Sequence, residues 1–243
     1  MRGKDPATVG AVGLAAADVD RVAGALCALR RNGLARFALA GGVAAAVHLG
    51  AGTGRPRALN DLDLVVPDAD AIPASLADGM LVNHLHFRAR PGRMLMQIVD
   101  PATSLRVDLF GSVGGQMGRA GPGLASLAGA RILSRPDLVA RLTRLLLDLA
   151  DGEPVARKHA RDHAALSGAD LDGIDAAWAD HRREHHPADY GEARRRALEV
   201  IRSEAGLLVD APPGFGRPCR LCAEQRGFRI APEEHIAAVL GRP

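Results

Sequence analysis

The chain has 243 residues, of which 47% are hydrophobic and 24% charged, which suits one large or two small globular domains. Charges interrupt every apolar run before the roughly 18 residues that a membrane span needs, and the amino terminus lacks the apolar region of a secretory signal. Three cysteines are too few for a disulfide scaffold, so we expect a cytoplasmic protein. Aromatic residues, at 3%, are too rare for a platform that stacks single-stranded nucleic acid.

The first half of the chain mixes predicted helices and strands. An amphipathic pattern over 15–32, ended by Gly33, predicts a helix that carries Cys27 on its apolar side, in the core. A short strand over 34–40 ends at Gly41-Gly42, and a buried helix follows over 43–49. Short apolar runs predict four more strands, at 62–66, 81–87, 94–99 and 104–110.

The second half has the periodicity of helices. Four are predicted after the glycine-rich loop 111–123, at 135–150, 155–168, 171–184 and 188–206. We therefore predict an α/β (α+β) fold, with a mixed sheet and flanking helices in residues 1–120 and a helical domain in 121–210. Residues 211–243, which contain a Cys-x-x-Cys sequence, are expected to form a separate appendage.

Three aspartates lie on two of the predicted strands. Asp61 and Asp63 are two residues apart, so both carboxylates point to the same face, and Asp108 lies between Val107 and Leu109. Carboxylates buried among apolar neighbours need a compensating cation. Ligation by oxygen alone favours Mg²⁺.

Gly41 and Gly42 lie between a predicted strand and a predicted helix. Without side chains, they let backbone N–H groups at the helix amino terminus approach a phosphate. A phosphate-binding turn beside a carboxylate cluster is the arrangement used for phosphoryl or nucleotidyl transfer with two metal ions.

The sequence GGVAAAVHLG followed by RALNDLD resembles the nucleotidyltransferase superfamily that includes DNA polymerase beta, and within it the AbiEii and minimal-nucleotidyltransferase groups. The resemblance covers residues 35 to 168. It implies that residues 1–120 are the catalytic domain, with two Mg²⁺ ions and an NTP as co-substrate. It also implies roles for six residues: Gly41 and Gly42 at the triphosphate, Arg57 in nucleotide binding, and Asp61, Asp63 and Asp108 as metal ligands.

A further match to the AbiEii group lies in the helical half. Lys158 and Asp162 are four residues apart on one face of a predicted helix. The resemblance implies that Lys158 binds the nucleotide and that Asp162 is catalytic. The alternative is an ordinary i, i+4 ion pair on a solvated helix, which contributes about 0.3 kcal/mol.

Cys219 and Cys222 supply half of a tetrahedral zinc site. His235, His185 or His186 could complete it, and redox-active or unremarkable thiols are the alternatives. His84 and His86 share a strand face, but no neighbouring sequence motif makes them a catalytic set.

The function expected from the sequence is Mg²⁺-dependent transfer of NMP from an NTP to a hydroxyl of RNA such as tRNA, of a protein or of a small molecule. The protein could act in a toxin–antitoxin pair, with a cognate antitoxin, or in phage defence. Two alternatives stay open: a non-catalytic nucleotide- or protein-binding member of the same fold, and a zinc-stabilised nucleic-acid-binding protein.

Overall fold

A computed structural model describes residues 12–50, 56–151, 155–168, 171–210, 222 and 224–241. The fold is mixed α/β, as predicted. Contacts divide the chain into two compact units: 1–112 with 120–133 and 216–243, and 113–119 with 134–215. Among the described residues, no helix is both long and apolar enough to cross a membrane.

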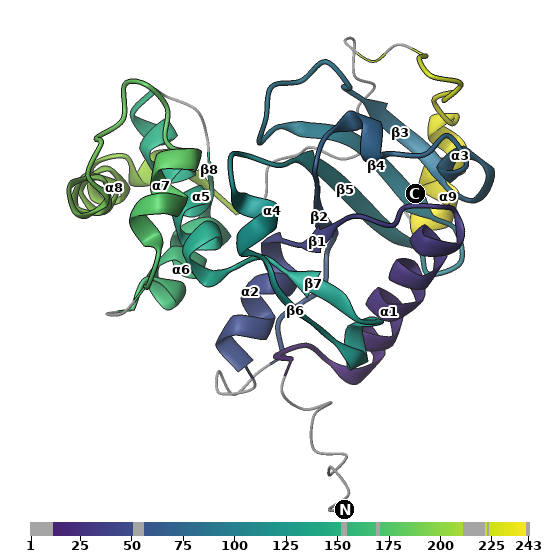
Figure 1. Ribbon diagram of the computed structural model, residues 1–243, viewed down its shortest axis with the longest axis horizontal. Coiled ribbons are helices and arrows are strands. Elements are labelled where there is room, and N and C mark those ends of the chain that lie inside the picture. The colour runs from purple at the N-terminus through teal and green to yellow at the C-terminus, as the bar shows by residue number, and fades with distance from the viewer. Residues whose placement is uncertain are drawn as a thin grey trace, which may run out of the picture. The chain divides into compact units, whose positions relative to one another are not determined.

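The first unit is built around a seven-stranded mixed sheet with the order β3-β4-β5-β2-β1-β7-β6 (Figure 1). Its strands are β1 (Ala38–Leu39), β2 (Leu62–Val66), β3 (Leu81–Leu85), β4 (Met94–Asp100), β5 (Leu105–Gly111), β6 (Gly121–Leu124) and β7 (Ala130–Ile132). β2 runs parallel to β5 and β1 parallel to β7, and the other neighbours are antiparallel. The strands predicted near 62–66, 81–87, 94–99 and 104–110 are confirmed.

β6 and β7 extend the sheet beyond residue 120. The predicted boundary there assigned both strands to the helical domain, but β7 pairs with β1 and β6 pairs with β7. They have four and three residues, and β6 reads Gly-Pro-Gly-Leu. Such short strands carry no alternation that a sequence pattern could reveal.

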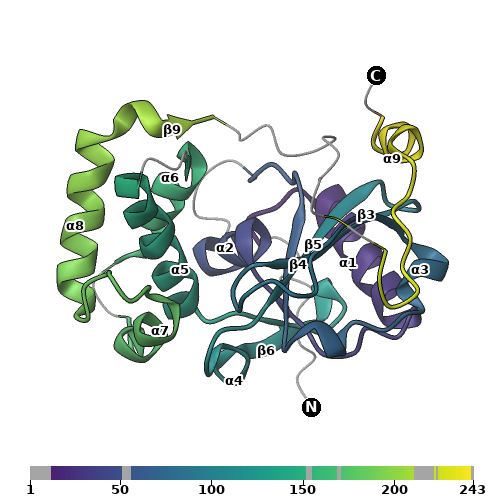
Figure 2. The same cartoon turned by 90° about the horizontal axis from the view of Figure 1, so that it is seen from above.

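Four helices accompany the sheet: α1 (Ala16–Arg31), α2 (Gly41–Leu49), α3 (Leu76–Gly79) and α9 (Glu233–Leu240). α1 contacts β5 and α2 contacts β2 (Figure 2). α1 buries Val22, Leu26 and Leu29, which recur every three or four residues. Cys27, one residue beyond Leu26, is exposed, so its predicted place in the core is wrong. A step of about 100° per residue turns it away from the sheet.

The carboxy-terminal segment belongs to the first unit. The Ala231 N–H donates a hydrogen bond to the Val82 carbonyl at 2.7 Å, and α9 lies beside β3 (Figure 1). Phe228 is fully buried and meets the Phe87 ring edge to face. The described part of 211–243 is therefore packed on the sheet, where the sequence predicted a separate appendage. The reason is that its apolar side chains find partners on β3 and the turn after it.

The second unit is mainly helical. It contains α4 (Gln116–Arg119), α5 (Arg135–Leu147), α6 (Arg157–Leu166), α7 (Ile174–His181) and α8 (Tyr190–Ser203), with a small parallel pair of β8 (Val155–Ala156) and β9 (Leu208–Val209). The four predicted helices are confirmed. Ser134 caps α5 by accepting from the Asp137 N–H, and Asp189 caps α8 in the same way from Glu192.

Candidate active site

The parallel pairing of β2 with β5 sets the three aspartates on one face of the sheet. The register places Asp63 directly opposite Asp108 and Leu62 opposite Val107. Opposite residues of a strand pair share a face, and Asp61 precedes Asp63 by two residues. The carboxylates therefore share one face, while Leu62 and Val107 are buried on the other. The backbone thus places Asp61, Asp63 and Asp108 on one face of the sheet, as predicted.

Arg106 connects two of these carboxylates. Its guanidinium Nη2 forms a very short ion pair with Asp61 Oδ2 and lies 3.4 Å from Asp108 Oδ2. No sequence motif marks this arginine, although its position two residues before Asp108 places it on the same strand face. A cation already lies between Asp61 and Asp108, so the site has the local charge compensation that buried carboxylates require.

Two side-chain amides, one on β4 and one on β3, form a chain of hydrogen bonds that ends at Asp108. The Gln97 Nε2 donates to Asp108 Oδ1 at 2.8 Å, and the Asn83 Nδ2 donates to Gln97 Oε1 at 2.6 Å. Gln97 lies opposite Asp108 in the β4–β5 register and opposite His84 in the β3–β4 register. The polar row on β3, β4, β5 and β2 is thus His84, Gln97, Asp108 and Asp63.

Asp108 has a strongly perturbed carboxyl group. Its pKa is raised to about 7, chiefly by burial, with the neighbouring charges of Asp63 and Asp61 acting in the same direction and the charge of Arg106 acting against them. The Gln97 hydrogen bond also lowers the pKa. A carboxyl group that shares a buried face with two others favours the proton or a cation over the free anion.

Gly41 brings the start of α2 against Asp63. Its φ of +54° lies in the left-handed region, and a Cβ atom built there would lie 2.7 Å from the Asp63 Cβ and overlap the carboxylate. The Ala40 N–H also donates to the Asp63 carbonyl at 2.9 Å. No side chain caps the amino terminus of α2. Only glycine permits this approach, because both the positive φ and the contact exclude a side chain.

Gly42 lies close to the side chain of Arg57. A Cβ at Gly42 would lie 3.2 Å from the Arg57 Nε. Arg57 is itself fixed through its backbone, whose N–H donates to the Gly13 carbonyl at 2.8 Å. The structure therefore brings the basic side chain, the glycine turn and Asp63 together, as the motif predicted.

Lys158 and Asp162 lie on α6, in the second unit. Asp162 is buried and Lys158 half-buried. They lie one turn apart on the helix, as the spacing predicted. Their proposed position near the nucleotide stays a prediction.

Histidine and cysteine side chains form a separate possible metal site among the described residues. Among the described His, Cys, Asp and Glu side chains, one group of three could hold a metal ion: His84, His86 and Cys222, whose ligand atoms all lie within 4.8 Å of one another. Cys219 lies outside the described residues. Cys222 is thus beside His84 and His86, two histidines that the sequence analysis did not connect with it.

No protein-family model matches the sequence, and no curated protein is significantly similar to it.

Proposed function

We propose that this protein is a Mg²⁺-dependent nucleotidyltransferase that moves NMP from an NTP to an acceptor hydroxyl and releases pyrophosphate. The observation that carries the proposal is the contact of Gly41 with Asp63, which lies opposite Asp108 in the sheet. The uncapped amino terminus of α2, a type of site that binds phosphate, is therefore next to an oxygen-only ligand set.

The carboxylates suit hard divalent cations in their chemistry, and the β2–β5 register places them on one face of the sheet. Asp61, Asp63 and Asp108 would hold two Mg²⁺ ions, for which Arg106 must withdraw from its bridging position. When bound, the metal ions supply neutralisation of the triphosphate and of the charge that develops on the leaving pyrophosphate. The burial of Asp108 beside two other carboxylates supports this fit, since such a group favours a bound cation or a proton over the free anion.

The chain's own residues position the nucleotide. The N–H groups of the first turn of α2 lack a side-chain cap, and Gly41 lies beside Asp63, so this helix terminus suits the phosphates. Arg57, beside Gly42, adds a guanidinium that pairs with phosphate oxygens in a fixed geometry. The roles that the resemblance implies for Lys158 at the triphosphate and for Asp162 in orientation or proton transfer belong to the same proposal.

The acceptor is proposed by chemical class only: an RNA such as tRNA, a protein or a small molecule. A role in a toxin–antitoxin pair or in phage defence belongs to the same proposal, with a cognate antitoxin as partner. The net charge of +3 selects none of these acceptors.

The ion pair between Arg106 and Asp61 favours a second candidate, a non-catalytic protein of the same architecture that binds a nucleotide or a partner protein. In that case Arg106 permanently satisfies the carboxylates, and the buried row is structural.

Transfer assays separate the two candidates. The full chain is incubated with Mg²⁺, each labelled NTP in turn, and total RNA, protein extract or aminoglycosides. We expect label to enter one acceptor class. Asp61→Asn and Asp63→Asn should each reduce transfer by at least about 100-fold, since several kcal/mol of charge stabilisation is lost. Asp172→Asn, an exposed carboxylate of the second unit, is the matched control.

Calorimetry with Mg²⁺–NTP complements the assay. Binding without transfer to any acceptor supports the non-catalytic candidate. Unchanged transfer in both site variants contradicts the proposed metal ligands.

A further inference from the structure

A second group of potential metal ligands lies at the other end of the polar row. His84 is on β3, His86 follows the end of that strand, and Cys222 comes from the carboxy-terminal segment. The His84 Nδ1 lies 3.3 Å from the Cys222 Sγ, and the His86 Nε2 lies 3.7 Å from the same sulfur. The three ligand atoms all fall within 4.8 Å of one another.

The two sulfur–nitrogen separations match a tetrahedral zinc ion. With Zn–S near 2.3 Å and Zn–N near 2.0–2.1 Å, a tetrahedral angle places sulfur and nitrogen about 3.6 Å apart. The two observed S···N distances lie on either side of this value. An ordinary thiol–imidazole hydrogen bond explains one such contact, but it does not explain why two imidazole nitrogens face the same sulfur.

Neighbouring groups support metal binding by these side chains. The Leu85 N–H donates to the Cys222 Sγ at 3.3 Å, a hydrogen bond of the kind that orients the side chains that bind a metal. Burial lowers the pKa of His84, with His86 and Arg106 adding to the effect, and burial also lowers the pKa of His86. Neutral imidazole is the form that ligates metals.

We propose that His84, His86 and Cys222 bind one Zn²⁺ ion that fastens the carboxy-terminal segment to β3. A thiolate and two imidazoles select zinc over Mg²⁺, which prefers oxygen. The site is separate from the carboxylates. Since His84 and Asp108 are two strands apart, their backbones are separated by about 10 Å across the sheet.

Zinc would reinforce contacts that already cover an edge of the sheet. β3 is an edge strand. The carboxy-terminal segment contacts this edge through the Ala231–Val82 hydrogen bond, and Phe228 contacts the Phe87 ring just after the strand. Arg226 adds a cation–π contact with Phe87, 5.1 Å from the ring centroid. The ligand residues Cys222 and His84 are 138 positions apart, so the metal closes a long loop and lowers the entropy of the unfolded chain.

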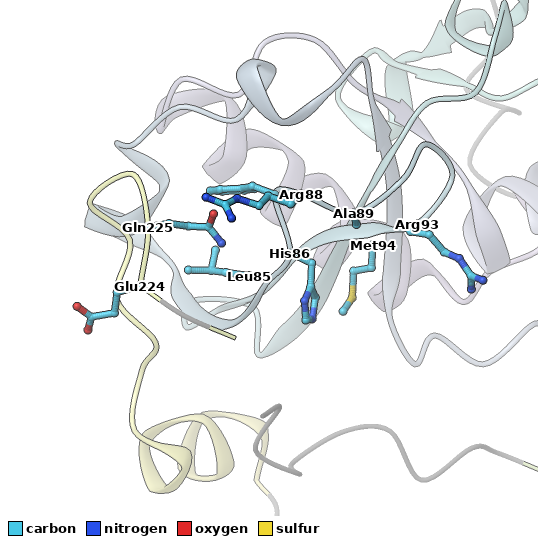
Figure 3. Close-up of a pocket in the computed structure, with 9 residues that line it drawn as sticks. Leu85, His86, Arg88, Ala89, Arg93, Met94, Glu224 and Gln225 are labelled. Atoms are coloured by element: carbon cyan, nitrogen blue, oxygen red, sulfur yellow. The ribbon is translucent and has the colours of Figure 1, made fainter. Parts of the chain in front are cut away.

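The site is open to solvent on one side. His86 lines a cavity of about 590 Å³, together with Met94 on β4 and Glu224 and Gln225 of the carboxy-terminal segment (Figure 3). Three protein ligands leave one position of a tetrahedral ion for water or an exogenous ligand. A chelator can therefore reach the metal through this cavity.

Metal analysis of the full chain tests the proposal. The protein is purified under reducing, chelator-free conditions, its zinc is measured by mass spectrometry, and the stripped protein is titrated with Co²⁺. We expect about one zinc per chain, and tetrahedral cobalt bands with a thiolate-to-cobalt charge-transfer band. His84→Ala, His86→Ala and Cys222→Ser should each weaken metal binding by more than the roughly 10–100-fold that loss of an outer-shell partner causes.

Two controls carry matched side chains outside the group. Cys27→Ser removes an exposed thiol on α1, and His235→Ala removes an exposed imidazole on α9. Both should bind zinc as the wild type does. If Cys222→Ser does not fold, Cys222→His should restore the cobalt bands without the charge-transfer band.

Hydrogen exchange provides an independent readout. Removal of zinc should increase exchange in 224–241 and leave β2 and β5 protected. A wild-type chain that holds no zinc and gives no tetrahedral cobalt spectrum overturns the proposal, as does a wild-type cobalt spectrum in the Cys222→Ser variant.

Discussion

The buried carboxyl group of Asp108 should make the stability of the apo protein depend on pH in a defined direction. Its pKa rises from the ordinary 3.8 to about 7 in the folded chain, chiefly because it is buried. The folded state therefore binds a proton more tightly than the unfolded state. The full stability is present below pH 3.8 and is lost as the pH rises toward 7. Three pKa units correspond to about 4 kcal/mol, an order-of-magnitude value.

Asp108→Asn removes this titration and keeps the shape of the side chain, including the oxygen that accepts from Gln97. Without Mg²⁺, we expect the variant to gain up to about 4 kcal/mol relative to wild type between pH 4 and pH 8. Subtracting the two unfolding free energies at each pH cancels the other titrating groups. The control, Asp172→Asn, changes an exposed carboxylate of the second unit and should show a flat difference.

Urea unfolding followed by circular dichroism is the appropriate assay, because the single tryptophan, Trp178, lies in the second unit and does not report on the sheet. Mg²⁺ should stabilise wild type at pH 8 and have little effect on the variant, since a ligand that binds only the folded state adds stability. A wild-type-minus-variant difference that stays constant within about 0.5 kcal/mol from pH 4 to pH 8 refutes the reasoning.

Two further predictions concern single contacts in the two units. Gly41→Ala should lower the unfolding free energy by at least about 1–2 kcal/mol, because alanine is strained at a φ of +54° and its Cβ displaces Asp63. The control is Gly42→Ala, whose Cβ meets only the end of the Arg57 side chain, so its effect should be near neutral. Equal losses of stability in the two variants would contradict this account. In the second unit, burial tends to raise the pKa of Asp137, but hydrogen bonds from His181, Arg119 and Ser134 outweigh it and hold the pKa at about 2. The resulting stabilisation is present above pH 3.8 and lost as the pH falls toward 2. Arg119→Ala should therefore destabilise the unit by about 2–3 kcal/mol at pH 7 and by less near pH 2, as followed by Trp178 fluorescence. Arg182→Ala, which removes an exposed arginine, is the control. A loss of stability that does not change with pH would count against the ion pair.

The local elements and the carboxylate site could be predicted from the sequence because their signals are local. Short apolar runs around Asp63 and Asp108 predicted the strands, and the two-residue period of a strand predicted the face of each side chain. The glycine pair at the start of α2 indicated a close backbone approach, and the positive φ of Gly41 shows why glycine is needed there. Helix periodicity likewise located α5 and its neighbours.

Contacts between distant segments could not be predicted in this way. Arg106 was visible on the strand face of Asp108, but its ion pair with Asp61 depends on the parallel pairing of β2 with β5. Strand pairing is chosen by the burial of whole faces, which single-strand patterns do not specify.

The cysteine–histidine group shows the same limit more clearly. Sequence patterns directed attention to the Cys219-x-x-Cys222 pair and to His185, His186 or His235 as further ligands, because ligand spacing is the signal that a sequence offers for such a zinc site. The structure instead brings Cys222 to His84 and His86, across 138 residues, because Phe228 and α9 bury apolar surface against β3. Side chains carry the chemistry of a site, but burial of apolar surface by the rest of the chain decides which of them meet.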